Sequence, residues 1–217
     1  MRSGTLIAIV SAAIVGAAVG VRLAGRGFDA RDHWTMVAGA ALFVVLSIYW
    51  AVAQKGNAPE QSSEAPLSRI IHQALVTAAF LLIVLPVPGL LARFLPPSNV
   101  VVAGGFVIDL FGLLLAIAAR RELGRNWSAQ VRIAEAHALV QTGPYRHVRH
   151  PIYSGALCMY AGLTLLSGTL HAGLGLIVVC LAYWRKITME ERLLQQHFGA
   201  GFDDYRRRSW AVVPRIF

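Results

Sequence analysis

Charged side chains are scarce in this sequence, and their scarcity excludes a soluble globular domain. Of 217 residues, 14% are Asp, Glu, Lys or Arg and 56% are hydrophobic, whereas a soluble domain carries roughly 25% charged residues. The mean hydropathy is +0.57. So few charges cannot cover the surface of a 23.5 kDa chain in water. The composition therefore predicts an integral membrane protein.

Lysine, cysteine and glycine-rich turns are also rare or absent. Lys55 and Lys186 are the only lysines, so the net charge of +9 comes almost entirely from arginine. The arginines lie at the ends of apolar runs, where they face lipid headgroups, and this argues against nucleic-acid binding. Cys158 and Cys180 give neither a disulfide framework nor a metal site, so we expect two reduced apolar fillers. No glycine-rich turn of the dinucleotide-binding type and no internal repeat is present.

Apolar runs of about 20 residues, the length that crosses a bilayer core, define the expected helices. They lie at residues 3–21, 33–54, 70–92 and 100–119. The first run is also compatible with a signal peptide, but no convincing cleavage site follows it, so we favour a helix. Pro86 and Pro88 are expected to bend or end the third helix. Asp109, in the fourth, is either functional or paired with an arginine inside the bundle, and we favour the pairing.

The longest apolar run, residues 151–184, has no charged residue in 34 positions. One straight helix of that length would be about 50 Å long, which is too long for one crossing. Its centre, residues 166–173, is rich in small and turn-forming residues. The run is therefore predicted to form a helical hairpin over residues 152–184, with arms at 152–167 and 172–184.

The predicted architecture is all-α and polytopic, with a four-helix transmembrane region at 1–119 and a second region at 120–217 that contains the hairpin. In this topology 16 of the 20 basic residues fall on one face of the membrane. The positive-inside rule makes that face cytosolic, although the first loop, with three arginines, falls on the other face. The loop before the hairpin and the C-terminal tail then meet at one cytosolic opening.

The loop before the hairpin is dense in side chains that bind ligands. It reads TGPYRHVRHPIYSG over residues 142–155. Pro151 suits the first turn of a helix, so Arg149 and His150 precede a helix N-terminus that favours an anion. Alternatively, this is a basic loop that binds lipid phosphates. A metal site at His147 and His150 is disfavoured, because the further ligands that a metal needs are missing.

A second polar cluster follows the hairpin and begins with Glu190 and Glu191. On a helix that continues from the hairpin, adjacent residues point in different directions, so we expect only one of them to face a pocket. An amphipathic interfacial helix with a solvated charged face is the alternative. The hairpin brings both clusters to the same opening, and this favours a functional site.

These clusters together resemble the isoprenylcysteine carboxyl methyltransferase and phospholipid methyltransferase family. The resemblance covers residues 120–217, and the order and spacing of its motifs make it specific. Two positions depart from the family pattern. Phe202 stands where relatives often have a tyrosine, and Trp210-Ala211 stands where they tend to have a basic residue. The motif residues are Gly143-Pro144-Tyr145, Arg149-His150-Pro151-x-Tyr153-x-Gly155, Glu190-Glu191-x-x-Leu194, Phe198-Gly199, Tyr205 and Pro214.

The resemblance implies an integral membrane enzyme that takes a methyl group from S-adenosylmethionine. The chemistry of the residues agrees, because a glutamate suits the ammonium group of S-adenosylmethionine and donors near His150 suit its carboxylate. Tyrosine rings or nearby apolar side chains suit its adenine. The residues to which the resemblance assigns cofactor binding are Tyr145, His147, Arg149, His150, Pro151, Tyr153, Gly155, Glu190 and Glu191.

The methyl acceptor is predicted to be a lipophilic or lipidated molecule that enters from the bilayer. A carboxylate acceptor needs an arginine to position it but no base, whereas an amine acceptor needs a base. Arginines beside Tyr205 favour a carboxylate, with Arg206 as its partner, and we predict that Arg206, Glu190 and Tyr205 take part in catalysis. N-methylation of a lipid amine such as phosphatidylethanolamine is the alternative. A small transporter is disfavoured, because few titratable residues lie inside the spans and the two halves do not resemble each other.

Overall fold

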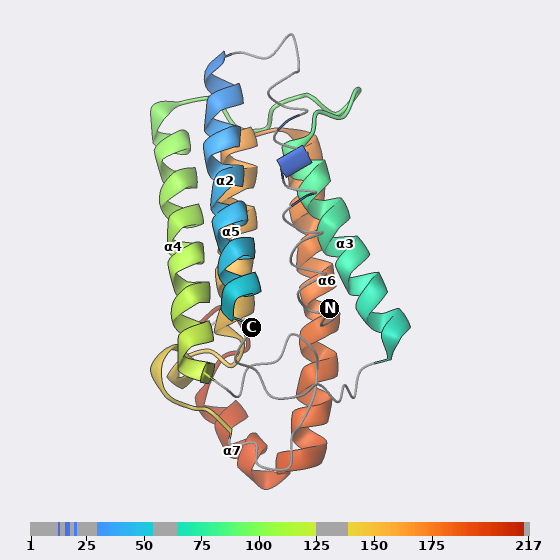
Figure 1. The fold of residues 1–217 in the computed structure, drawn as a ribbon, viewed down its shortest axis with the longest axis vertical. Helices are drawn as coiled ribbons and strands as arrows, with labels where there is room; N and C mark the ends of the chain where they lie inside the picture. The colour runs from blue at the N-terminus through green and yellow to red at the C-terminus, as the bar shows by residue number, and fades with distance from the viewer. Residues whose placement is uncertain are drawn as a thin grey trace.

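The computed structural model is a bundle of long helices with a short helix across one end (Figure 1). It describes residues 30–53, 65–124 and 139–214, with a few isolated positions between 13 and 20. Within these ranges the regular secondary structure is helical, as the sequence predicts, and the loops between the helices contain two isolated β-bridges. The elements are α2 (Ala30–Ala53), α3 (Pro66–Val84), α4 (Asn99–Leu123), the 3-10 helix η3 (Gly143–Arg146), α5 (Pro151–Ser167), α6 (Leu170–Phe198) and α7 (Ala200–Arg208).

Helices α2, α3, α4 and α6 are each long and apolar enough to cross a membrane, and α5 is a shorter apolar helix. The expected spans at 33–54 and 100–119 correspond to α2 and α4. The expected span at 70–92 is too long at its far end, since α3 stops at Val84, just before Pro86 and Pro88. The expected span at 3–21 lies almost wholly outside the described residues.

The hairpin predicted at 152–184 is present as α5 and α6. Gly168 closes α5 with φ 63°, a left-handed conformation that costs glycine little, and Thr169 precedes α6. The second arm differs from the prediction, because α6 starts at Leu170 and continues past Trp184 to Phe198. The helix therefore carries its polar C-terminal half, including both glutamates, beyond the apolar part of the hairpin.

Two pairs of glycines set the distance between α4 and α5. A Cβ atom added to Gly112 would lie 2.4 Å from the carbonyl oxygen of Gly155, and one added to Gly155 would lie 2.6 Å from that of Gly112. Gly105 and Gly162 form the second pair, where the corresponding distances are 3.0 and 2.6 Å. Such contacts leave no room for a side chain and permit Cα–H···O contacts between the backbones. The first turns of α5 are thereby fixed against the middle of α4.

Asp109 is fully buried at this interface but does not form the expected arginine pair. Neither of its carboxylate oxygens has a hydrogen-bond partner among the described residues. Its neighbours are small, since a Cβ on Gly162 would lie 2.7 Å from the Cβ of Asp109 and one on Gly39 would lie 3.3 Å from Oδ2. The favoured expectation was wrong because close helix packing, and not a cation, surrounds this side chain.

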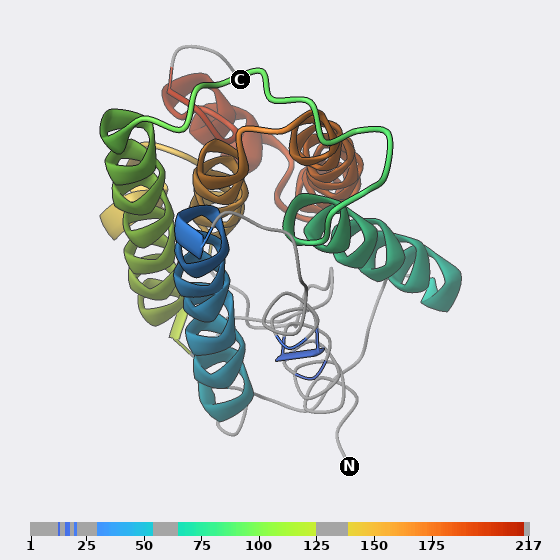
Figure 2. The ribbon, with the colours of Figure 1, turned by 90° about the horizontal axis from the view of Figure 1, so that it is seen from above.

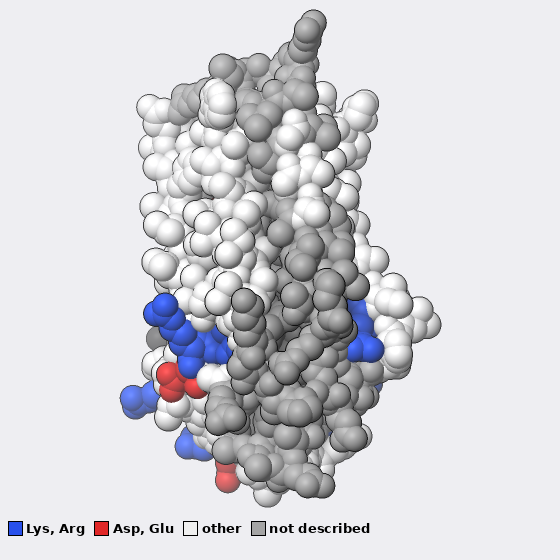
Figure 3. All heavy atoms as spheres, in the orientation of Figure 1, with Lys and Arg blue, Asp and Glu red and all other residues white. Residues whose placement is uncertain are grey.

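The charged residues gather at one end of the bundle. α2 and α4 end there, α3 and α5 begin there, and α6 extends through it into α7 (Figures 1 and 2). On the face drawn in Figure 3, the blue and red side chains lie over this lower end, and the described surface above them is uncharged. Arg93 lies at the other end, beside the α5–α6 turn, where its backbone forms an isolated antiparallel β-bridge with Thr169. For the basic residues that the structure describes, this arrangement agrees with the expected separation into two faces, whereas Arg22 and Arg26 lie outside the described residues.

The glycine contact predicts a selective effect of an added methyl group. We expect Gly112→Ala to destabilise the protein by about 2 kcal/mol, because the backbone of α5 cannot move away without disturbing the bundle. Thermal unfolding of the purified protein in detergent measures this change. Gly104→Ala is the control on the same helix, since a Cβ there meets nothing within 4 Å, and helix propensity predicts a small stabilisation. Equal melting temperatures for the two variants would contradict the contact.

Candidate functional site

The loop before α5 and the tail after α7 form a short two-stranded ribbon. The N–H groups of Arg149 and His150 donate to the carbonyls of Trp210 (2.7 Å) and Ala211 (3.0 Å). In return, the Trp210 N–H donates to the carbonyl of His147 (3.1 Å). The tail therefore returns to the start of the hairpin, so that residues about 60 positions apart share one site.

Backbone turns place His150 at the N-terminus of α5. Gly143 has φ 55° and opens η3, and Pro151 occupies the first turn of α5, where its missing N–H costs nothing. The hydroxyl of Ser154 donates to the carbonyl of Val212 at 2.7 Å and thus attaches the tail to the first turn of α5. Arg149 and His150 are consequently held against the bundle on one side and the tail on the other.

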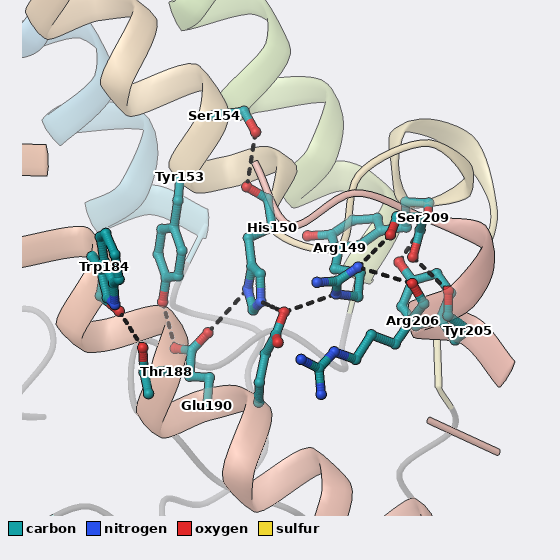
Figure 4. A network of polar contacts seen from close by, with 12 residues as sticks. Arg149, His150, Tyr153, Ser154, Trp184, Thr188, Glu190, Tyr205, Arg206 and Ser209 are labelled. Atoms are coloured by element: carbon teal, nitrogen blue, oxygen red, sulfur yellow. Dashed lines mark hydrogen bonds and ion pairs between the residues drawn. The ribbon is translucent and has the colours of Figure 1, made fainter. Parts of the chain in front are cut away.

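Glu190 and Glu191 reach across from α6 to this corner and form one polar network (Figure 4). Arg149 Nε donates to Glu191 Oε1 at 2.8 Å, and His150 Nε2 lies 3.2 Å from the same oxygen. His150 Nδ1 lies 3.4 Å from Glu190 Oε2, and the hydroxyl of Tyr153 donates to Glu190 Oε1. We call these five side chains the ionic network. The expectation that only one glutamate faces the site was wrong, because His150 lies between the two and contacts both.

The ionic network is sheltered from water. The side chains of Arg149 and His150 are 8% and 6% exposed, and those of Glu190 and Glu191 are 19% and 16% exposed. The ring of Tyr153 stacks on His150 with centroids 5.6 Å apart and planes 8° apart. The ring of Tyr153 also packs against the ring of Tyr183 of α6, with centroids 5.0 Å apart. Aromatic rings and oppositely charged side chains thus lie side by side in one mostly buried region.

Charge pairing shifts the titration of the network. Burial alone would lower the pKa of His150, but the hydrogen bonds that its ring donates to the two glutamates and their negative charge raise the pKa above 6.5. Burial alone would raise the pKa of Glu191, but hydrogen bonds and positive charge from His150 and Arg149 lower it to about 2. The network therefore keeps His150 protonated to a higher pH than a free histidine and keeps Glu191 ionised to a lower pH than a free glutamate.

Tyr145 and Tyr205 are buried next to the network. The hydroxyl of Tyr205 donates to the carbonyl of Tyr145 at 2.6 Å, and the Ser209 hydroxyl donates to the carbonyl of Tyr205 at 2.7 Å. Burial raises the pKa of both phenols well above 10. Tyr205 therefore connects the loop before α5 with the start of the C-terminal tail through buried hydrogen bonds. Phe202 is also buried, so position 202 is an apolar position of the core in this chain.

The remaining predicted site residues lie in three different settings. Gly155 faces α4, where it provides the close helix contact described above. Pro151 is buried at the helix start, whereas the side chain of His147 is exposed and only its backbone carbonyl joins the ribbon. Arg206 is exposed on α7, and its side chain extends toward the network (Figure 4).

Three contributors to the site could not be identified from the sequence motifs. Two serines anchor the tail. The hydroxyl of Ser154 donates to the backbone carbonyl of Val212, and the backbone carbonyl of Ser209 accepts a hydrogen bond from Arg149 Nη1. Tyr183 supports the ring of Tyr153. Only the position of Tyr183, near the end of the apolar arm of α6, offered a signal, since aromatic residues are common where a helix leaves the membrane.

Comparison with known proteins agrees with this architecture. The sequence model of the phospholipid methyltransferase family matches residues 100–201. A probable protein-S-isoprenylcysteine O-methyltransferase of Oryza sativa subsp. indica is 30% identical over 118 residues, which are 52% of this chain and 60% of the rice protein. Protein-S-isoprenylcysteine O-methyltransferase B of Arabidopsis thaliana is 32% identical over 52% of this chain and 58% of its own length. The chain thus spans about 60% of the length of these relatives.

Two further similarities concern a bacterial protein and a solved structure. The nickel-cobalt-cadmium resistance protein NccN of Alcaligenes xylosoxydans xylosoxydans is 38% identical over 43% of this chain and 45% of its own length. No group of three or more metal-binding side chains occurs among the residues that our structure describes. The solved structure is that of the eukaryotic intramembrane Ras methyltransferase ICMT (isoprenylcysteine carboxyl methyltransferase). Its TM-score is 0.60 at 17% identity, over all of this chain and 79% of that one, so this likeness concerns the fold.

Fold and site together define a polytopic helical membrane protein with a sheltered ionic network at one end of its bundle. The family resemblance predicted from the motifs is confirmed. Residues 100–201 match the phospholipid methyltransferase family, about half of the chain is similar to protein-S-isoprenylcysteine O-methyltransferases, and the fold is that of an isoprenylcysteine carboxyl methyltransferase structure.

The ionic network predicts a defined pH dependence of stability. Because the folded-state pKa of His150 lies above 6.5, its contribution is complete below that pH and is lost as pH rises through the folded-state value. The contribution of Glu191 is complete above 4.5 and is lost as pH falls toward 2. We therefore expect His150→Gln to lower the melting temperature most at pH 5–6, by an amount equivalent to about 3 kcal/mol, and less at pH 9.

Thermal unfolding of both proteins at several pH values measures this difference. His147→Gln is the matched control, because His147 is an exposed histidine in the same loop. Its melting temperature should follow that of the parent protein at every pH. A constant difference between His150→Gln and the parent from pH 5 to pH 9 would show that His150 is not charged in the folded protein.

Proposed function

We propose that this protein is an integral membrane S-adenosylmethionine-dependent methyltransferase that O-methylates the carboxylate of a lipid-like, isoprenylcysteine-type acceptor. One observation carries the proposal: the ionic network gathers Arg149, His150, Tyr153, Glu190 and Glu191 from motifs about 40 residues apart in the sequence. Those motifs lie within the segment that matches the phospholipid methyltransferase family. The names of the rice and Arabidopsis relatives support the choice of acceptor.

The side chains of the network fit the chemical groups of S-adenosylmethionine. Its ammonium group suits a carboxylate of Glu190 or Glu191, and its carboxylate suits the guanidinium of Arg149 or the imidazolium of His150. Its adenine suits the flat faces of Tyr153 and nearby rings. When bound, S-adenosylmethionine supplies an activated methyl group on a positively charged sulfur.

The protein then has mainly to bind, align and exclude water. Arg149 and His150 hold the two glutamates in fixed orientations, so that little reorganisation is needed when an ammonium group arrives. Burial of the network limits access of water, which strengthens each polar contact. A carboxylate acceptor is already ionised at neutral pH, so its methylation needs no base, only a cation that orients it. We assign this role to Arg206, which is exposed on α7 and whose side chain extends toward the network (Figure 4).

The membrane helices provide the route for a greasy acceptor. α4 carries exposed apolar side chains along its length, with Val107 67% exposed and Leu114 57% exposed. The site lies just beyond the bilayer-length part of this helix, so an acceptor with its tail among the lipids presents its head at the level of the network. The concentration of arginine at this end supports a cytosolic orientation of the site.

Binding of S-adenosylmethionine to the purified full-length protein tests the cofactor assignment. By calorimetry in detergent, we expect saturable binding by the parent protein and at least about tenfold weaker binding by Glu190→Ala, Glu191→Ala and His150→Ala, since each loses a charged contact. Glu190→Gln and Glu191→Gln keep the side-chain shape and guard against loss of folding. Gln196→Ala, an exposed position on α6, should bind like the parent. Absence of binding by the parent protein would refute the proposal.

The chemical stability of the product identifies the acceptor. Incubation with methyl-labelled S-adenosylmethionine and an N-acylated S-prenylcysteine should give a methyl ester, whose label mild base releases as methanol. Phosphatidylethanolamine vesicles tested in parallel should accept no label. N-methylation of a phospholipid amine is the second candidate, because the matched family is described as phospholipid methyltransferase. A base-stable product from phosphatidylethanolamine would establish that function instead.

A further inference from the structure

Carboxylates near the site are already used in contacts within the protein. Five described acidic residues follow Asp109, and each has a hydrogen-bond or ion-pair partner. The partners come from the loop, α6, α7 and the ionic network. The pairs are Glu122 with Thr142, Glu190 with Tyr153, Glu191 with Arg149, Asp203 with Gln195, and Asp204 with Arg207.

Four exposed arginines at the same end of the bundle differ from these acidic residues, because they form no ion pair among the described residues. Within the described part of the chain, the guanidinium groups of Arg121, Arg146, Arg192 and Arg206 have no carboxylate within ion-pair distance. They come from four different elements, namely the last turn of α4, η3, α6 and α7. Each is close in sequence to a residue of the site, except Arg121, which ends the helix that packs against α5. We call these four side chains the arginine rim.

The arginine rim adjoins a network in which each carboxylate already contacts a basic side chain. Arg192 follows Glu191 in the sequence, Arg146 lies three residues before Arg149, and the carbonyl of Arg206 accepts a hydrogen bond from Arg149 at 3.4 Å. Low-dielectric walls and charges of one sign focus the electric field at such an opening and raise the local concentration of ions of the opposite sign. The C-terminal part of α6 and the whole of α7, the two elements that carry Arg192 and Arg206, project beyond the ends of α2, α3 and α4 (Figure 1).

We propose that the arginine rim selects acceptors that carry additional negative charge outside the membrane. The preferred acceptor is then a lipidated molecule with an acidic peptide next to its carboxylate, and a lipidated molecule with a basic peptide there is disfavoured. This inference rests on the methyltransferase function proposed above and specifies its substrate class. Attraction acts on the encounter and binding of the acceptor, so it affects KM and not the methyl transfer step.

Two matched acceptors test this inference. Both are peptides that end in an S-prenylated cysteine with a free carboxylate, and they differ only in three Asp or three Lys residues before the cysteine. With the full-length protein in neutral detergent at low salt, we expect the KM of the acidic peptide to be lower by about tenfold, with similar kcat. At about 1 M salt, where the screening length is about 3 Å, the two KM values should converge.

Variants locate the source of the preference. Arg146→Gln and Arg192→Gln should each reduce the KM ratio of the two peptides about twofold, and the double variant more. Arg93→Gln removes the same charge at the opposite end of the bundle and should leave the ratio unchanged. An N-acylated S-prenylcysteine without a peptide reports the basal activity for every variant.

Each outcome is informative. Equal KM values, or a preference for the basic peptide, would overturn the inference while methylation of the simple acceptor keeps the proposed function. Methylation of the simple acceptor alone would also overturn it. If anionic lipid vesicles raise the activity through Arg146 and Arg192 but the peptides do not differ, the rim binds headgroups and the inference is wrong. No methylation of any acceptor would instead remove the proposed function itself.

Discussion

Buried charge is the constraint on which the rest of this structure depends. Arg149, His150, Glu190 and Glu191 are mostly withdrawn from water, and each would be costly there without an opposite charge in contact. The contacts must therefore form together, which requires the start of α5, the far half of α6 and the returning tail to meet at one corner. The ionic network is therefore the set of contacts that holds these three segments together.

The membrane helices make that joint possible. The glycine pairs let α4 and α5 approach until their backbones touch, which fixes where α5 begins. The turn at Gly168 then directs α6 back along the bundle, and the unbroken helix to Phe198 delivers both glutamates at the height of His150. A rigid helix transmits position over this distance better than a loop. The site is therefore positioned by packing inside the bilayer-length part of the molecule, although its chemistry lies beyond it.

Much of this arrangement could be predicted from the sequence because it follows from hydropathy and spacing. Apolar run length predicts the helices, and the small residues at 166–173 predict the hairpin. What failed depends on contacts in three dimensions. Whether Asp109 meets a cation or a glycine depends on helix rotation, which hydropathy does not determine. Adjacent glutamates both reach His150 because the imidazole lies between them and offers a nitrogen to each, and no one-dimensional pattern contains that geometry.

The two electrostatic environments of the site have different consequences for its ligands. S-adenosylmethionine carries a net positive charge, so a network whose carboxylates already contact basic side chains does not attract it from a distance. Under the proposed function, its binding rests on short-range contacts with Glu190 and Glu191, which are already oriented by His150 and Arg149. An anionic acceptor is attracted over several ångströms by the arginine rim. Under the proposed function the two ligands are thus recognised by different physics: the cofactor by a preformed, sheltered contact, and the acceptor by the field around it.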